Sequence, residues 1–385
     1  MKILITQCFD FPEGQSNRSY LFAQELSKIG HNVTFFTNRY NHLDSYKKKI
    51  NKNFDNKIEH IFFDNKYFRN QKFLSVIFNS FGLIKILKKK KFDLIIGPSV
   101  PLLNSFFALI FKKKKTKFFY EIRDVWPDAL IFNNAISKLN PIYILLKIFE
   151  ICIYKFSDGL ISALPKTYKY VKKYNKNLPQ LYLPNSYKSF SSFKKKFRKK
   201  NLKIIYIGRF NAAHDIEIIL LTAKYLLLEK KFKNITFDLY GYGEKINYIK
   251  QYVSFNNLTN VKIKGKIEKN KIYKLSKRYD LALCTITDSN AFKWGTNLNK
   301  IYEYFNSSMP VIFSGKVPYN PVKLANCGFV SSSFNYKDLS NDILKFKKLN
   351  IRQKEKFSIN AKKFFDANYS LNINTKKLNN FIESI

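Results

Sequence analysis

Short apolar runs alternate with longer stretches of helical periodicity along most of the chain. The runs are continuous rather than alternately apolar and polar, which indicates strands buried on both faces, as in a parallel sheet. Between them lie segments with a helical period, such as residues 20–29, which end before Gly30. The strands expected in the first half cover residues 2–6, 33–37, 57–63, 93–96, 118–122, 159–162 and 180–183. This rhythm predicts a doubly wound α/β domain.

The rhythm breaks at residues 187–201, which are rich in Ser, Phe and Lys, and then restarts. Strands are expected again at residues 203–208, 235–240, 260–264, 281–285, 310–313 and 328–331. We therefore expect two Rossmann-like domains, residues 1–186 and 202–365, joined by a linker at 187–201. A C-terminal helix of about residues 366–385 is expected to pack back on the first domain. Two such domains in tandem predict a cleft that faces the carboxyl ends of both sheets.

Composition excludes global disorder and leaves the cause of the charge open. Of 385 residues, 45% are hydrophobic, which is enough for two cores. Lys and Arg number 69 against 27 Asp and Glu, a formal charge of +42. This excess favours an anionic partner, namely nucleic acid, a phosphorylated substrate or an acidic membrane surface. Lysine-rich, solvated surface in a chain with AT-rich codons is the alternative.

Neither the cysteines nor the apolar segments indicate export or membrane insertion. The four cysteines lack pairing or metal-ligand spacing, which suits a reducing cytosol: Cys8, Cys152, Cys284 and Cys327. The first residues lack the apolar core of a signal peptide. Residues 94–111 are apolar but contain two prolines, so a buried strand, a turn and a buried helix are expected there rather than a membrane span.

Two segments of the first half carry candidate chemistry. Gly14 and Ser16 lead into a helix whose free N–H groups attract anions, and Arg18 adds positive charge. Arg123 and Asp124 follow an apolar strand; Asp124 can accept hydrogen bonds from hydroxyls or act as a base, and Arg123 can hold it or a phosphate. The alternatives are an ordinary strand-to-helix turn at the first segment and a structural Arg–Asp pair at the second.

In the second half, Gly208 and Arg209 end a strand just before a helix begins, which makes an anion clamp of a guanidinium group and a helix N-terminus. His214 lies in the same loop and can contact a phosphate or the donor. Gly241 and Gly243 follow another strand, where glycine permits close approach of a ligand to the backbone.

Further along, a polar loop that contains Gly295, Asn297 and Asn299 leads into a helix. Lys300 and Glu303 lie three residues apart and so share one face of this helix. Lys300 suits a phosphate and Glu303 suits the vicinal hydroxyls of a ribose. A surface ion pair is the alternative.

Together these segments resemble, over nearly the whole chain, the retaining GT-B glycosyltransferases of group 1, glycosyltransferase family 4. The matching segments are Gly30-His31-Asn32-Val33-Thr34, Pro184-Asn185, Gly208-Arg209, residues 240–243, 261–266 and 299–304, and Met309-Pro310-Val311-Ile312. Residues 123–127 and 294–300 look like a subgroup that builds bacterial O-antigen and capsule, which includes N-acetylfucosamine-type transferases.

The resemblance implies roles for individual residues. Arg209 and Lys300 would hold the donor diphosphate, and Glu303, the second Glu of the family's E-x7-E element, would bind the ribose. The residues that would border the base and phosphates are Gly243, Gly265 and Lys266. Asp124 or Arg123 would stand near the reacting sugar. No metal or other cofactor is expected, and the donor would be a nucleotide diphosphate sugar, UDP-linked.

Three positions depart from the family pattern. Gly295 replaces the first Glu of E-x7-E, which puts sugar recognition there in doubt. His214 replaces a clamp lysine, which should weaken the clamp unless the imidazole is protonated. The usual Pro-Asn-Gly turn has Ser186 in place of its glycine.

The resemblance also implies a lipid-linked glycan acceptor of the undecaprenyl diphosphate type, at the cytoplasmic face of the inner membrane. Apolar residues 73–87 and 106–111 each precede a lysine run, at 88–91 and 112–115, which suits peripheral binding to an anionic bilayer. Two core helices with solvated ends are the alternative. The alternative functions are a sugar-nucleotide epimerase of the UDP-N-acetylglucosamine 2-epimerase type, a basic nucleic-acid-binding protein and a non-catalytic scaffold. No nucleic-acid partner is expected, because the sequence has no RRM, KH, OB or zinc-finger signature and its lysines are spread over both domains.

Overall fold

The chain forms two compact units, each built around a parallel sheet. The computed structural model describes residues 1–10, 17–39, 57–64, 66, 71–132, 135–191, 193, 195–198, 200–229, 232 and 234–385. Unit 1 comprises Met1–Ser186 and Leu371–Ile385, and unit 2 comprises Tyr187–Ser370. Residues 187–201 therefore belong to unit 2 by their contacts. Lys195, for example, is buried there and its Nζ donates to the Ser276 carbonyl at 2.9 Å.

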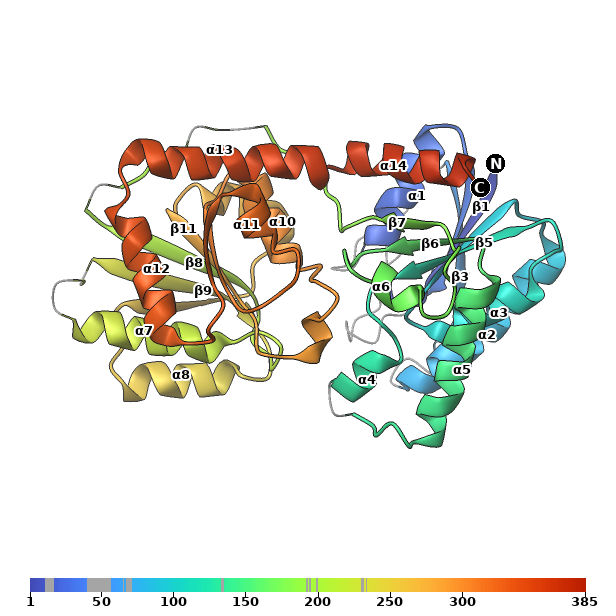
Figure 1. Cartoon of the computed structure of the whole chain (residues 1–385), viewed down its shortest axis with the longest axis horizontal. Coiled ribbons are helices and arrows are strands. Elements are labelled where there is room, and N and C mark those ends of the chain that lie inside the picture. The colour runs from blue at the N-terminus through green and yellow to red at the C-terminus, as the bar shows by residue number, and fades with distance from the viewer. Residues whose placement is uncertain are drawn as a thin grey trace. The chain divides into compact units, whose positions relative to one another are not determined.

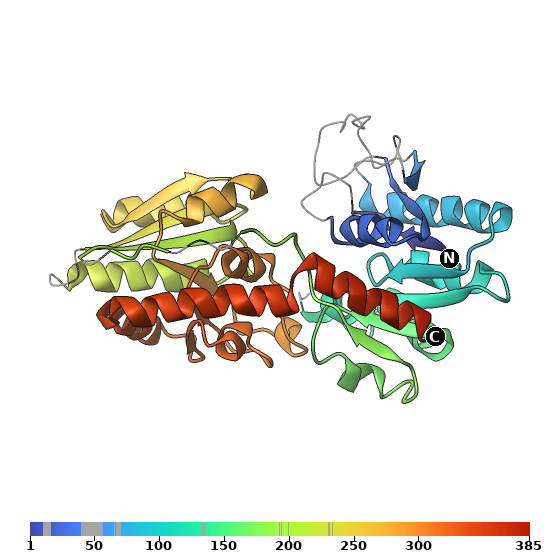
Figure 2. The same cartoon turned by 90° about the horizontal axis from the view of Figure 1, so that it is seen from above.

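The described part of unit 1 holds seven parallel strands in the order β3-β2-β1-β4-β5-β6-β7. The strands are β1 (Lys2–Thr6), β2 (Asn32–Asn38), β3 (Ile58–Phe63), β4 (Leu94–Pro98), β5 (Lys117–Ile122), β6 (Gly159–Ser162) and β7 (Gln180–Tyr182). The helices are α1 (Arg18–Lys28), α2 (Lys72–Lys89), α3 (Leu102–Phe111), α4 (Asp128–Phe132), α5 (Pro141–Phe156), α6 (Tyr168–Val171) and α14 (Leu371–Glu383). Helix α14 packs beside α1 (Figures 1 and 2).

Among the residues described for unit 2, six parallel strands lie in the order β10-β9-β8-β11-β12-β13. The strands are β8 (Leu202–Arg209), β9 (Ile235–Tyr242), β10 (Val261–Gly265), β11 (Leu281–Thr285), β12 (Val311–Ser314) and β13 (Gly328–Ser331). The helices are α7 (Ile216–Leu228), α8 (Ile246–Phe255), α9 (Lys269–Ser276), η3 (Asn290–Phe292), α10 (Asn299–Asn306), α11 (Pro321–Ala325), α12 (Tyr336–Lys348) and α13 (Ile351–Asn368).

The continuous apolar strands build a core on both faces of each sheet. In β8, Ile204 and Tyr206 pack in one core with α7 and α12, while Ile205 and Ile207 pack in another with α10 and α13. These helices cover opposite faces of the sheet in Figure 1. Because successive side chains of a strand point to opposite faces, a strand covered on both sides must be apolar at every position. The predicted α/β class and parallel sheets are confirmed.

The segment 94–111 folds as expected into strand β4 and helix α3, although α3 is only partly buried. Leu102, Asn104, Ser105 and Ala108 are buried, whereas Ile110 and Phe111 at its C-terminal end are exposed. No helix within the described residues combines the length and apolar character needed to cross a membrane.

Candidate functional site

The second sheet has its topological switch point at β8. This strand lies between β9, to which the chain runs next, and β11, to which the chain crosses back after β10. Open α/β sheets bind ligands outside the carboxyl ends of their strands at such a point. Strand β8 ends there in Gly208 and Arg209, and helix α10, which carries Lys300 and Glu303, follows β11 in the chain.

Lys300 is buried against the end of β8 rather than exposed on its helix. Its side chain lies with Nζ 2.9 Å from the Tyr206 hydroxyl, to which it donates, and 4.2 Å from the Tyr206 ring centroid. The Tyr206 hydroxyl in turn donates to the Arg209 carbonyl at 3.1 Å. A Cβ at Gly208 would lie 2.7 Å from the lysine Nζ, so glycine leaves the space that the ammonium group occupies. The interpretation of Lys300 as a surface ion pair is therefore wrong.

Burial sets the electrostatics of this lysine. Desolvation lowers the pKa of Lys300 to about 8, although Cys284 and Glu303 partly offset the shift. Glu303 lies one turn along α10 and is thus close enough to act on the ammonium group. The ammonium group is still mostly charged at neutral pH. A bound anion would stabilise it by replacing the water that burial removes.

Two further cations lie around a second tyrosine at the same edge of the sheet. The Arg209 guanidinium carbon is 5.6 Å from the Tyr242 ring centroid, and Lys266 Nζ is 5.2 Å from it. Both side chains are exposed, and both distances suit cation–π contacts. Within the described part of the chain, Arg209, Lys266 and Lys300 form no ion pair with an acidic side chain. This edge of unit 2 therefore concentrates positive charge that an anionic ligand can use.

The loop after β8 adds buried polar atoms that lack partners. Asn211 Oδ1, His214 Nδ1 and, at the end of β11, Thr285 Oγ1 find no hydrogen-bond partner among the described residues. Buried polar atoms are normally satisfied, so this group indicates a ligand. Burial, followed by the charges of Lys300 and Arg209, lowers the pKa of His214 to about 3. His214 is thus neutral at physiological pH and cannot replace a clamp lysine by protonation.

Different structural constraints act on the glycines at this edge of the sheet. A Cβ at Gly241 would lie 2.1 Å from the Gly208 carbonyl oxygen, and one at Gly243 would lie 2.3 Å from the Phe210 carbonyl oxygen. Contact with neighbouring backbone therefore requires glycine at both positions, and the approach of a ligand to them stays a prediction. Gly265, by contrast, has a φ of 72° and open space around it, so its backbone is accessible.

The backbone of the loop before α10 is unfavourable for the glutamate that the family pattern has at position 295. Gly295 has a φ of 107°, a conformation that a glutamate rarely adopts. Asn297 Oδ1 accepts a hydrogen bond from the Tyr302 hydroxyl at 3.0 Å, which ties this loop to α10. Asn299 is exposed at the first position of that helix.

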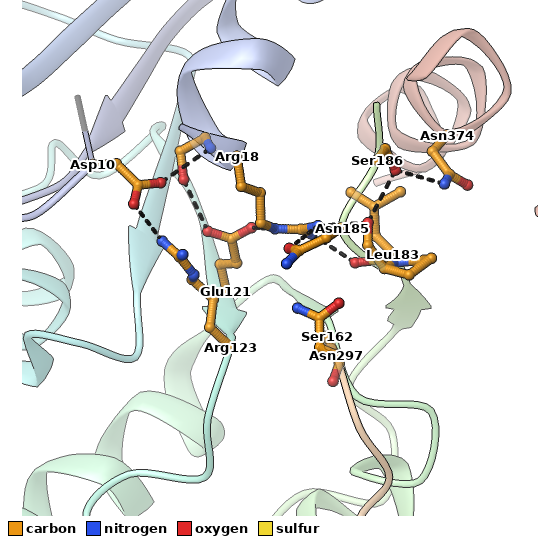
Figure 3. A network of polar contacts seen from close by, with 12 residues as sticks. Asp10, Arg18, Glu121, Arg123, Ser162, Leu183, Asn185, Ser186, Asn297 and Asn374 are labelled. Atoms are coloured by element: carbon orange, nitrogen blue, oxygen red, sulfur yellow. Dashed lines mark hydrogen bonds and ion pairs between the residues drawn. The ribbon is translucent and has the colours of Figure 1, made fainter. Parts of the chain in front are cut away.

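The first sheet gathers charge too, but pairs it internally (Figure 3). Arg18 is buried and its Nε lies 2.8 Å from Glu121 Oε1. Its remaining donors reach the Pro184 carbonyl at 2.6 Å, the Leu183 carbonyl at 2.7 Å and Asn185 Oδ1 at 3.3 Å. The expectation that Arg18 offers charge to the donor is therefore wrong, because its guanidinium group is buried and its charge is paired with Glu121 within unit 1.

Arg123 is paired as well, though not with its neighbour. Its Nη1 lies 2.8 Å from Oδ1 of the buried Asp10, an acidic residue that the sequence analysis did not select. Asp124 is exposed after the carboxyl end of β5 and remains accessible. The predicted residues Gly14 and Ser16 lie outside the described residues.

Sequence reasoning also missed the two tyrosines of unit 2. Tyr206 lies within an apolar strand, so nothing in the sequence separates it from a core residue. Tyr242 lies between the selected Gly241 and Gly243, and an aromatic residue at that position, near basic strand ends, was a signal that could have been used.

Comparisons with known proteins agree with this geometry. The family model "Glycosyl transferases group 1" matches residues 188–364, and the model "Glycosyltransferase Family 4" matches residues 12–180. A search of curated protein sequences finds no match.

Similar solved structures share the fold at low sequence identity. Sucrose-phosphate synthase from Thermosynechococcus elongatus is 12% identical with a TM-score of 0.75, covering 100% of this chain and 98% of that one. Anabaena Alr3699/HepE in complex with UDP is 13% identical with a TM-score of 0.72 and full coverage of both chains (100%). WaaG, a glycosyltransferase involved in lipopolysaccharide biosynthesis, is 15% identical with a TM-score of 0.69 and 98% coverage of each. The two family matches, which together span nearly the whole chain, and the shared fold show that this chain belongs to the group 1 glycosyltransferases of the GT-B fold.

Proposed function

We propose that this glycosyltransferase moves a hexosyl or N-acetylaminosugar residue, with retention, from a UDP-linked donor to a lipid-linked glycan acceptor in bacterial surface polysaccharide synthesis, as in O-antigen or capsule. The observation that carries the proposal is the group of cations at the switch point of unit 2 that form no ion pair with any described acidic residue. A nucleotide diphosphate sugar offers the matching diphosphate, and its departure creates the charge that these side chains would stabilise.

The proposed mechanism assigns one task to each side chain. Lys300 and Arg209 bind the diphosphate and stabilise it as the bond to the sugar breaks, because fixed cations act most strongly where charge develops. Lys266 and the backbone at Gly265 border the phosphates and base. Glu303 accepts hydrogen bonds from the ribose hydroxyls. Charge stabilisation by these side chains, rather than by a bound metal, is part of the proposal.

Neutral His214 contributes a hydrogen bond rather than charge. Its unpartnered Nδ1 lies in the loop that holds Asn211 and precedes α7, where a donor group can satisfy it. Retention proceeds by front-face attack, in which the departing phosphate takes the proton of the acceptor hydroxyl. The accessible carboxylate of Asp124 is proposed to accept hydrogen bonds from sugar hydroxyls near the reacting carbon.

The relatives support the donor and the pathway class. Alr3699/HepE has been crystallised with UDP and with UDP-glucose. WaaG and WaaB are described as acting in lipopolysaccharide synthesis, WaaB as an outer core galactosyltransferase. We extend these properties to the present chain, with the acceptor presented at the cytoplasmic face of the inner membrane.

Turnover of a panel of nucleotide sugars, with and without a lipid-linked sugar diphosphate, tests the proposal. We expect UDP release to rise strongly only when both donor and acceptor are present, and the product to keep the anomeric configuration of the donor. Conversion of a UDP-sugar to its epimer without acceptor would instead identify an epimerase. Tight binding of nucleic acid without binding of any nucleotide sugar would contradict the assignment as well.

A further inference from the structure

Helix α5 has its polarity inverted relative to an ordinary surface helix. Two of its three charged residues, Lys147 and Glu150, face the interior of unit 1, where they pair at 2.8 Å. The Glu150 side chain is 0% exposed, whereas Ile142, Leu145 and Ile148 are 56%, 50% and 51% exposed. A helix that borders water normally turns its charged face outward. Exposure of the outward face of α5 to water is therefore unfavourable.

The interior of unit 1 is built to hold these charges. Lys147 Nζ also lies 2.7 Å from Asp128 Oδ1, and Glu150 accepts hydrogen bonds from the hydroxyls of Tyr154 at 2.8 Å and Tyr170 at 3.0 Å. A rotation of α5 that exposed Lys147 and Glu150 would break all of these contacts. The apolar side chains are thus held outward by the packing beneath them.

This apolar surface continues over two neighbouring helices. Helix α3 packs between α2 and α5 on one face of the sheet (Figure 1). The rings of Phe81 in α2 and Phe107 in α3 lie 6.1 Å apart, and those of Phe106 in α3 and Phe149 in α5 stack at 3.9 Å. Phe81 and Ile110 are exposed like the residues of α5. We call the outward side of α2, α3 and α5 the three-helix face.

Lysines gather at one end of this face. Each of the three helices leads into a strand of the same parallel sheet, β4, β5 or β6, so the C-terminal ends of the helices lie at one edge. The exposed lysines at these ends are Lys88, Lys89, Lys91, Lys113, Lys114, Lys115 and Lys155. Glu150, which is buried, is the one acidic residue in the three helices. Apart from the exposed Lys85 of α2, the three-helix face is therefore mostly apolar along its length, and it is cationic at its rim.

We propose that the three-helix face docks on a bilayer leaflet that contains anionic lipid, with the outward side chains of α5 inserted at the boundary between headgroups and acyl chains and the lysine rim on lipid phosphates. A leaflet supplies both kinds of contact, hydrocarbon for the isoleucines and leucine and negative charge for the lysines. A second copy of the chain would add another lysine rim to the interface, and like charges repel.

The reason for membrane binding rests on the proposed function, since a lipid-linked acceptor is located at a membrane. The identification of the three-helix face rests only on the contacts described above. It also changes the mode of binding expected from the sequence. Lysine runs alone predict attachment that salt removes, because electrostatic attraction to anionic lipid is screened. Insertion of α5 predicts attachment that persists in part at high salt.

Flotation of the full chain with vesicles of phosphatidylcholine, with or without phosphatidylglycerol, tests the face directly. The double substitution Leu145→Ser with Ile148→Ser should weaken binding to the anionic vesicles by about tenfold or more, and the remainder should be lost at high salt. Leu228→Ser removes an exposed leucine of unit 2, 71% exposed, and is the matched control that should bind like the wild type. UDP binding measured on each variant reports whether the fold is retained.

Equal vesicle binding by the wild type and by a folded double variant would overturn the proposal. So would a wild-type dimer that these substitutions dissociate while vesicles bind neither protein, because the face would then join two copies. Failure of the proposed function is distinguishable: a chain that binds vesicles through α5 but transfers no sugar contradicts the transferase assignment alone.

Discussion

The carboxyl ends of the two sheets both carry positively charged residues, but they use them differently. In unit 1, Arg18 and Arg123 are paired with the buried acids Glu121 and Asp10. In unit 2, Lys300 lies against a tyrosine, and neither it nor Arg209 has an acidic partner in an ion pair within the described residues. The comparison separates charged residues that are neutralised inside the protein from charged residues that are left available to a ligand.

The largest expected effect is the loss of stability caused by Arg18→Met, which tests whether the buried ion pair of unit 1 is structural. The substitution leaves Glu121 buried without its partner, which typically lowers the free energy of unfolding by about 3–5 kcal/mol. Urea denaturation measures the change. Lys28→Met, which removes an exposed partner of Glu25, is the control and should change stability by less than about 1 kcal/mol. An Arg18→Met protein as stable as this control would show that the buried pair is not structural.

Lys300→Met tests whether the cations of unit 2 serve the reaction. Loss of the buried cation is expected to lower turnover by about a hundredfold or more, as for other groups that stabilise developing charge. The free energy of unfolding should hold or rise, because a desolvated charge is removed. Steady-state turnover and urea denaturation are compared with Lys262→Met, an exposed lysine of β10. Retained turnover in Lys300→Met would contradict the proposed clamp.

The pH dependence of UDP affinity tests whether the charge of Lys300 is used to bind the diphosphate. The diphosphate favours the protonated form of Lys300, whose pKa is about 8 in the free protein. Affinity should therefore be high below pH 8 and fall by up to about tenfold per pH unit as the pH rises above that value. Calorimetric titrations across this range measure the slope. Lys300→Met should lose it, and an identical slope in that variant would place the titrating group elsewhere.

His214→Gln should have the smallest effect, since it removes a neutral hydrogen-bonding group rather than a charge. Turnover should fall by no more than about tenfold. Because the pKa of His214 is lowered to about 3, UDP affinity should show no histidine titration between pH 5 and 7. An affinity that rises on acidification through this range in the wild type but not in His214→Gln would show that the imidazole binds as a cation.

The fold was largely predictable because a strand that is buried on both faces is apolar at successive positions, and this pattern is visible within one short segment. The run at residues 203–208 is apolar at Ile204, Ile205, Tyr206 and Ile207, which pack alternately on two cores. Helix-end signals were readable for the same local reason: Gly30, which follows α1, has a φ of 101°. Only short-range chemistry is needed for such predictions.

The site was less predictable because it depends on pairing between distant segments. Nothing near Arg18 in sequence reveals that Glu121, 103 positions away, neutralises it. The same holds for Asp10, which holds Arg123 across 113 positions. Conversely, the spacing of Lys300 and Glu303 does not reveal that the lysine is buried against Tyr206. The outward face of α5 likewise required knowledge of which side Lys147 and Glu150 occupy.

Calorimetric titration of uridine, UMP and UDP at pH 7 tests the central claim most directly. If the uncompensated cations of unit 2 hold a diphosphate, the wild type should bind UDP at least about tenfold more tightly than UMP, with uridine weaker still. In Lys300→Met and Arg209→Met this preference for UDP should largely disappear. A preference that survives in both variants would contradict the claim.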